Sequence, residues 1–134
     1  MEQYLKEKHM NNNEYLELIE KYPELTTHGF GVETQYEELP YDELFKVKRQ
    51  ELKDAYQEFL YCCKWIEANP EFDGKRIAYH WKHRVEEWLQ ANNMKPNYIA
   101  QGTFILAAIY MGYPIHRIKK SSGARFSKKL EVTA

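Results

Sequence analysis

The spacing of apolar and polar positions predicts four helices along the chain. In each of four stretches the apolar residues recur at steps of three or four, which is typical of a helix with one buried face. These stretches are residues 14–22, 41–69, 75–91 and 98–111. The second carries the longest such pattern and predicts one long amphipathic helix, which Pro70 and the Asp73-Gly74 turn would end.

The fourth stretch is apolar on nearly every side between Thr103 and Tyr110, which predicts the most buried helix of the four. Asn13 and Asn97 are suitable N-caps for the first and fourth helices. Gly112 is a suitable residue to end the fourth, because glycine readily adopts the left-handed conformation found after a helix.

Two segments lack a helical period. Residues 24–40 contain the flexible His28-Gly-Phe-Gly31 run and predict a loop with room for a short extended piece. Residues 115–118 follow Pro114 and predict a second short extended segment. The expected fold class is therefore mainly α, a single compact bundle of about four helices with a long second helix.

The two ends of the chain offer little apolar surface for burial. Residues 1–12 are polar and predict a flexible leader ahead of the fold. Residues 119–134 are rich in Lys, Arg, Ser and Gly and predict a basic, mobile tail. A single helical domain is then expected over residues 13–118.

Charge divides unevenly along the chain. The formal net charge is only -1, so the molecule as a whole has no strong field that would draw it to nucleic acid or to a membrane. Residues 1–60 nevertheless hold 14 acidic and 7 basic side chains, whereas residues 61–134 hold 6 acidic and 12 basic ones. Either the fold separates an acidic from a basic surface, or it interleaves the two halves and the asymmetry cancels.

Cysteine usage and hydropathy bear on the compartment. Cys62 and Cys63 are adjacent, so on a helix they point about 100° apart and are poor disulfide partners. They are typical of reduced core thiols. No apolar run approaches the ~20 residues that span a bilayer, so we expect no membrane partner and a cytoplasmic location.

The third predicted helix concentrates charged and ring side chains. Lys82, His83 and Arg84 could donate hydrogen bonds to an anion, either a phosphate backbone or the acidic face of a partner. Glu86 and Glu87 follow at helical spacing and could instead pair with these donors along the helix. The pattern leaves both readings open.

The C-terminal region adds further positive charge next to aromatic and glycine residues. Basic arms of this composition are used for nucleic-acid binding, because cations meet phosphates and a ring can stack on a base. They are also common as solubilising ends, and no sequence-reading motif is present. The candidate cations are Arg117, Lys119, Lys120, Arg125 and Lys128.

Metal and catalytic motifs are not found. His80, His83 and Glu87 could share one helix face, but a zincin helix needs its two histidines four positions apart with a Glu after the first. We therefore favour a solvated or capped histidine pair and predict no metal and no cofactor. Phosphate loops, nucleophile elbows and paired-cysteine redox motifs are also lacking, so we predict no catalytic residues and no enzymatic activity.

The region from Tyr79 to Tyr113 resembles a family of small uncharacterised proteins encoded on phages, prophages and plasmids. The first half of the resemblance is a helix with Tyr79, Lys82, His83 and Glu86. The second half is a helix that contains Tyr98, Ile99, Gly102, Phe104, Ile105, Ala107 and Ala108, closed by Gly112 and Tyr113. Residues 1–70 lie outside it. The resemblance implies a mobile-element origin and no particular mechanism.

Two functions are expected from these observations. The leading hypothesis is a non-catalytic binding protein that engages nucleic acid or a nucleoprotein through the basic helix face and the tail. The alternative is an inhibitor of a host protein, such as a CRISPR effector, that acts by protein contact and phosphate mimicry. Its acidic surface would be Glu33, Glu37, Glu38 and Asp42. A homodimer through a long helix is compatible with either function.

Overall fold

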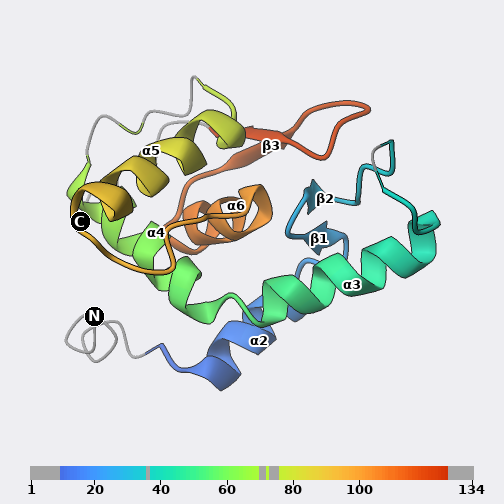
Figure 1. Ribbon diagram of the computed structural model, residues 1–134, viewed down its shortest axis with the longest axis horizontal. Helices are drawn as coiled ribbons and strands as arrows, with labels where there is room; N and C mark the ends of the chain where they lie inside the picture. The colour runs from blue at the N-terminus through green and yellow to red at the C-terminus, as the bar shows by residue number, and fades with distance from the viewer. Residues whose placement is uncertain (1–9, 36, 70–71, 73–75, 127–134) are drawn as a thin grey trace.

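A computed structural model describes residues 10–35, 37–69, 72 and 76–126 (Figure 1). The described residues form five helices and four short strands, which confirms a mainly α fold with one helix more than expected. The helices are α2 (Asn12–Glu20), α3 (Tyr41–Lys53), α4 (Tyr56–Ala68), α5 (Ala78–Ala91) and α6 (Gln101–Tyr110). The strands are β1 (Leu25–Thr26), β2 (Gly29–Phe30), β3 (Ile115–Arg117) and β4 (Ala124–Phe126).

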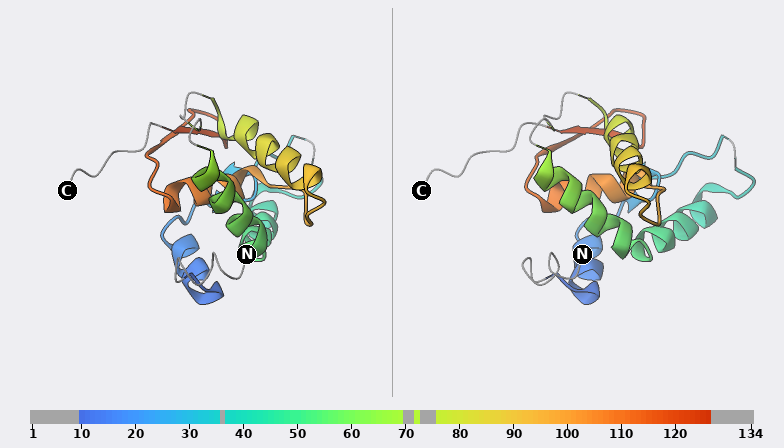
Figure 2. Two further views of the ribbon diagram at one scale, coloured as in Figure 1. Left: turned by 90° about the vertical axis from the view of Figure 1, so that its left-hand side faces the viewer. Right: turned by 60° about the vertical axis from the view of Figure 1, so that its left-hand side comes forward.

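The long helix predicted over residues 41–69 is wrong. The chain leaves the helix at Asp54 and Ala55, so that α3 and α4 are separate and α3 extends to one side of the body (Figures 1 and 2). Tertiary contacts explain the break, because Leu52 and Ala55 are both buried and the Leu52 carbonyl accepts a hydrogen bond from the buried Tyr15 hydroxyl. Periodicity alone could not reveal it, since the apolar spacing continues across the junction.

The flexible leader predicted over residues 1–12 ends too late in the chain, because residues 10–12 belong to the fold. Residues 1–9 lie outside the described part, but Met10 is buried in the core and Asn11 caps α2 by accepting a hydrogen bond from the Glu14 amide at 2.9 Å. The cap is therefore two residues earlier than the Asn13 that the sequence favoured.

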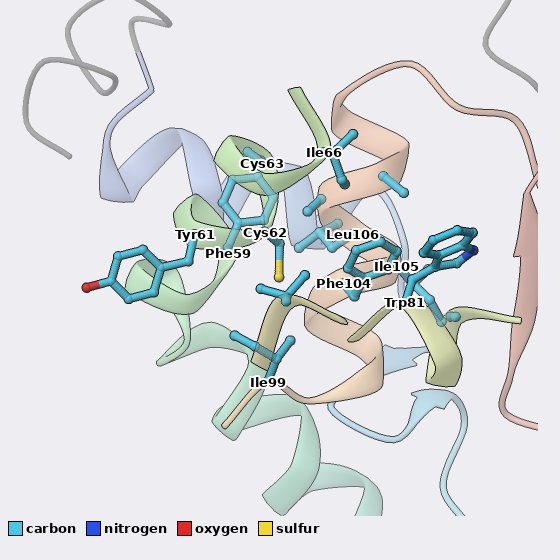
Figure 3. Packing of buried hydrophobic residues seen from close by; sticks show 14 of the residues in the cluster. Phe59, Tyr61, Cys62, Cys63, Ile66, Trp81, Ile99, Phe104, Ile105 and Leu106 are labelled. Carbon is cyan, nitrogen blue, oxygen red and sulfur yellow. The ribbon is translucent and has the colours of Figure 1, made fainter. Parts of the chain in front are cut away.

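Helix α6 is the most buried element, as its all-round apolar pattern predicts. It packs chiefly against α4 and also against α5, and it contacts the β1–β2 hairpin as well (Figures 1 and 2). Figure 3 shows Phe59 and Cys62 of α4 facing α6, which contributes Phe104 and Leu106. All seven residues from Gly102 to Ala108 are buried, so α6 is held on every side.

Two antiparallel hairpins complete the fold. The pair β1–β2 confirms a short extended piece within residues 24–40, and β3 confirms the one at 115–118. The mobile tail predicted from residue 119 is wrong for its first part, because β4 pairs with β3 and buries Ala124 and Phe126 in the core. Ala124 and Phe126 are buried and Arg125 between them is exposed, which is the alternation expected of a strand with one buried face.

The described helices are 9 to 14 residues long. Among them, none is both long enough and apolar enough to span a membrane.

Candidate functional site

A hollow of about 280 Å³ opens where four segments meet beside α5. The segments are the β1–β2 turn, the segment between β2 and α3, the start of α6 with the residues just before it, and the β3–β4 loop. We call this hollow the tyrosine pocket. It is lined by Thr27, His28, Glu33, Glu37, Tyr79, Lys82, Tyr98, Gln101 and Ser122.

Close backbone approach brings these segments together. A Cβ on Gly102 would lie 1.7 Å from the Thr26 carbonyl oxygen, so only glycine allows α6 to start against the β1–β2 turn. The Gly102 amide donates to the Thr27 carbonyl at 3.0 Å, and the Phe30 amide donates to the Ser122 carbonyl at 2.8 Å. The Gln101 side-chain amide adds a hydrogen bond to the His28 carbonyl at 2.6 Å. The floor of the pocket is therefore fixed by backbone contacts.

Lys82 lies in the wall of the tyrosine pocket and is only 5% exposed. Its Nζ is 3.3 Å from a Glu86 carboxylate oxygen, 4.5 Å from the centre of the Tyr98 ring and 5.3 Å from that of the Tyr79 ring. A buried ammonium needs such a counter-ion, because losing its hydration is costly. Of the two readings of Lys82 that the sequence left open, pairing along the helix is the one the structure has.

Glu86 joins the third and fourth predicted helical regions. Besides Lys82, its carboxylate contacts His83 Nδ1 at 2.8 Å and accepts a hydrogen bond from the buried Ile99 amide at 2.8 Å. An ionised carboxylate can only accept, so His83 Nδ1 carries the hydrogen. Two members of the predicted cationic surface, Lys82 and His83, are thus tied to one acid, while Arg84 remains exposed.

His28 sits in the β1–β2 turn with a defined tautomer. Its Nδ1 accepts a hydrogen bond from the Glu33 amide at 3.1 Å, so the ring hydrogen is on Nε2. Burial, and then the charge of Lys48, lower the pKa of His28 below its usual value. The ring therefore contributes no positive charge to the tyrosine pocket at neutral pH.

The structure divides the four predicted acids into two pairs. Glu33 and Glu37 line the tyrosine pocket, and Glu33 also accepts a hydrogen bond from the Ser122 hydroxyl at 3.0 Å. Glu38 precedes α3, Asp42 lies in its first turn, and both are exposed. Within the part of the chain that the structure describes, no ion pair engages any of the four.

The predicted cations of the C-terminal region fall on the β3–β4 hairpin. Arg117 is engaged, because it pairs with Glu24 and its guanidinium lies 4.6 Å from the centre of the Phe30 ring. Lys119, Lys120 and Arg125 are exposed on the turn and on β4. Lys128 lies outside the described residues.

Metal ligands do not gather in the described residues. No group of three His, Cys, Asp or Glu side chains there could hold a metal ion. His83 contacts Glu86 and not Glu87, and the His80 ring lies 4.9 Å from that of Trp81. Burial, followed by Arg76 and Arg84, lowers the pKa of His80. The proposed face of His80, His83 and Glu87 therefore does not assemble as a cluster.

A second hollow, of about 170 Å³, adjoins the first and was not predicted from the sequence. We call it the junction hollow, because it lies where the α3–α4 junction meets the start of α6. It is lined by Thr27, Glu51, Ala55, Glu58, Tyr98, Ala100 and Thr103. Thr27 and Tyr98 line both hollows. The sequence predicted neither hollow, because both are formed by residues from segments far apart in the chain, and the exposure of Tyr98 is visible only in the structure.

The chain was also compared with known proteins. No family model, no curated protein and no solved structure matches it.

Proposed function

We propose that the protein is a non-catalytic binding protein and that the tyrosine pocket receives a basic segment of a partner protein. The observation that carries this proposal is the charge balance of the pocket. Lys82 is neutralised by Glu86, while Glu33 and Glu37 at the pocket carry no ion pair with a described residue. The pocket therefore favours a cation over a phosphate.

The aromatic rim supports a protein partner. Tyr98 is 66% exposed and Tyr79 is 53% exposed, although both are large rings beside the core. Exposed tyrosines lose little conformational entropy on binding and are enriched at protein interfaces, where they often contribute most of the affinity. The Lys82 ammonium lies within cation–π distance of both rings, and this contact favours an ordered rim before binding.

The acidic surface indicates what kind of partner would fit. Glu33 and Glu37 at the pocket, with exposed Glu38 and Asp42 further along the same segment, present carboxylates as a nucleic-acid backbone presents phosphates. A protein that binds nucleic acid offers the complementary basic surface. With the resemblance to mobile-element proteins, this favours an inhibitor of a host protein, such as a CRISPR effector. The buried, reduced thiols of Cys62 and Cys63 fit a reducing compartment such as the cytoplasm.

The test is affinity capture from a nuclease-treated lysate of the native host, using the full chain and a charge-reversal variant. Glu37→Lys with Glu38→Lys should abolish a complex that the unchanged chain retains after nuclease. The matched control is Glu17→Lys with Glu87→Lys, which makes the same change in charge at exposed acids of α2 and α5 and should keep the complex. Equal capture by both double variants would contradict the proposal.

A second candidate function is nucleic-acid binding by the β3–β4 hairpin. It is favoured by the exposure of Lys119, Lys120 and Arg125, which have no ion pair within the described residues. Binding would then weaken steeply as salt rises, and Lys119→Gln with Lys120→Gln would lower the slope of log affinity against log salt by about 2. A mobility-shift titration without binding at low salt would exclude this function.

A further inference from the structure

The junction hollow is lined by a residue whose side-chain hydroxyl is buried. Thr103 lines this hollow and is fully buried, and its Oγ1 has no hydrogen-bond partner among the described residues. A buried hydroxyl without a partner is unfavourable by about 1–3 kcal/mol, so native proteins rarely keep one without a reason. This hydroxyl belongs to a residue in the wall of a hollow that adjoins the tyrosine pocket.

Two carboxylates line the same hollow. Glu51 is already engaged, because it pairs with Lys48 at 3.1 Å and lies 3.4 Å from the Thr27 hydroxyl. Glu58, in the first turn of α4, has no ion pair with a described residue. The charge of Glu58 acts on the interior. Burial is the main cause that raises the pKa of Tyr15, and the Glu58 charge is the second. The hollow is thus lined by a carboxylate that has no ion pair with a described residue and by a residue whose hydroxyl has no hydrogen-bond partner among the described residues.

We propose that the junction hollow binds the ammonium group of a lysine side chain from the partner protein. Glu58 supplies the counter-ion, Thr103 Oγ1 accepts one ammonium hydrogen bond, and the Tyr98 ring covers the methylene stem. This inference rests on the proposed function, because the same partner segment would cross Tyr98 from the tyrosine pocket into the hollow.

The acceptors of the hollow distinguish lysine from other ligands. An ammonium is a compact charge with three rotatable donors, which suits one carboxylate and one hydroxyl. A guanidinium is a planar fork that binds best to two acceptor oxygens side by side, which one carboxylate and one hydroxyl on different helices do not provide. Phosphate is disfavoured by Glu51 and Glu58, and a divalent metal would find no group of three protein ligands among the described residues.

The experiment titrates the isotope-labelled full chain with small probes and follows backbone amide resonances of residues 98–103 and Glu58. The main probe is acetyl-Gly-Lys-Gly-amide. The uncharged control peptide carries norleucine in place of lysine, and a third peptide carries arginine. Putrescine, a free diamine, tests whether the hollow binds a small-molecule amine and not a protein side chain. We expect saturable shifts with the lysine peptide and at least tenfold weaker binding of the norleucine and arginine peptides.

Two variants test the assigned groups independently. Glu58→Gln removes the charge and Thr103→Val removes the hydroxyl while keeping its shape, and each should weaken the lysine peptide about tenfold. Glu17→Gln, an exposed acid on α2, is the matched control and should leave binding unchanged. If either variant does not fold, the other still decides the question, because the two alter different elements.

Several outcomes would overturn the inference. Equal shifts with the lysine and norleucine peptides would show an apolar site, and unchanged affinity in both variants would place the ammonium elsewhere. Binding of putrescine without binding of the lysine peptide would assign the hollow to a free amine. Lysine-peptide binding together with failed capture from lysate would refute only the proposed partner, whereas capture without peptide binding would refute only this inference.

Discussion

The tyrosine pocket and the junction hollow share Tyr98 and Thr27 in their linings, but they differ in whether their buried polar groups have hydrogen-bond partners. In the tyrosine pocket the buried Lys82 is bonded to Glu86, and Glu86 in turn is bonded to His83 and to the Ile99 amide. In the junction hollow the buried Thr103 hydroxyl has no partner within the described residues. The buried polar groups that α5 contributes to the tyrosine pocket are thus satisfied without a ligand, whereas the Thr103 hydroxyl of the junction hollow has no partner among the described residues.

This difference separates polar groups that stabilise the fold from polar groups that a ligand could bond. A satisfied buried network fixes the arrangement of the elements that carry it, and a ligand gains little by competing for it. An unsatisfied group has its cost already present in the free protein, so a ligand that bonds it removes that cost on binding. Lys82 therefore holds α5 against the segment before α6, whereas Thr103 is a group that a ligand can use.

The largest expected effect comes from removing the buried ion pair between Lys82 and Glu86 in the tyrosine pocket. Glu86→Gln retains an acceptor for the Ile99 amide but leaves the buried Lys82 ammonium without a counter-ion. We expect a loss of about 3–5 kcal/mol in the free energy of unfolding, measured by urea denaturation. Adding Lys82→Met should restore most of it, because the uncompensated charge is then gone. A loss below about 1 kcal/mol in the single variant would mean that Lys82 is solvated and free to bind an anion.

The next effect is a gain in stability, and it concerns the Thr103 hydroxyl of the junction hollow. Thr103→Val replaces a buried hydroxyl that has no partner with a methyl group of similar shape, so stability should rise by about 1 kcal/mol. The matched control is Thr26→Val. The Thr26 hydroxyl is also fully buried, but it donates to the Gly31 carbonyl at 2.8 Å and accepts from the His28 amide at 3.0 Å.

Thr26→Val should therefore destabilise the protein by about 1–3 kcal/mol, since two backbone partners lose their bond. The comparison is made by urea denaturation at one pH, with unchanged dependence of the unfolding free energy on urea as the sign that both variants fold alike. Destabilisation of the same size by Thr103→Val would mean that its hydroxyl is bonded within the protein, and the contrast between the two hollows would be lost.

The sequence predicted the elements better than it predicted the hollows, and the reason is physical. Helical spacing revealed α2, α5 and α6, because each buries a face or its whole surface. The α3–α4 break depends on Tyr15, far away in sequence, which bonds the Leu52 carbonyl. Whether Lys82 faced solvent or Glu86 could not be decided from spacing that allowed both. The junction hollow required that break and the approach of α6 at Gly102, so no local pattern could contain it.

The smallest expected effect is a pH dependence that originates at the rim of the tyrosine pocket. Burial and Lys48 lower the pKa of His28 in the folded protein, with Glu33, Glu37 and Glu51 acting weakly in the opposite direction. The unfolded chain, with a pKa near 6.5, then takes up a proton first as pH falls. Stability from this group is complete above about pH 6.5 and is lost as pH decreases through the folded pKa.

His28→Asn should remove this contribution without removing the hydrogen bond, because the Asn side-chain oxygen can accept from the Glu33 amide in place of Nδ1. The melting temperature of the variant should therefore decline less than that of the unchanged chain between about pH 7 and pH 5. Parallel pH profiles for the unchanged chain and His28→Asn would mean that His28 is hydrated when folded. The tyrosine pocket would then gain positive charge in mild acid and lose its preference for cations.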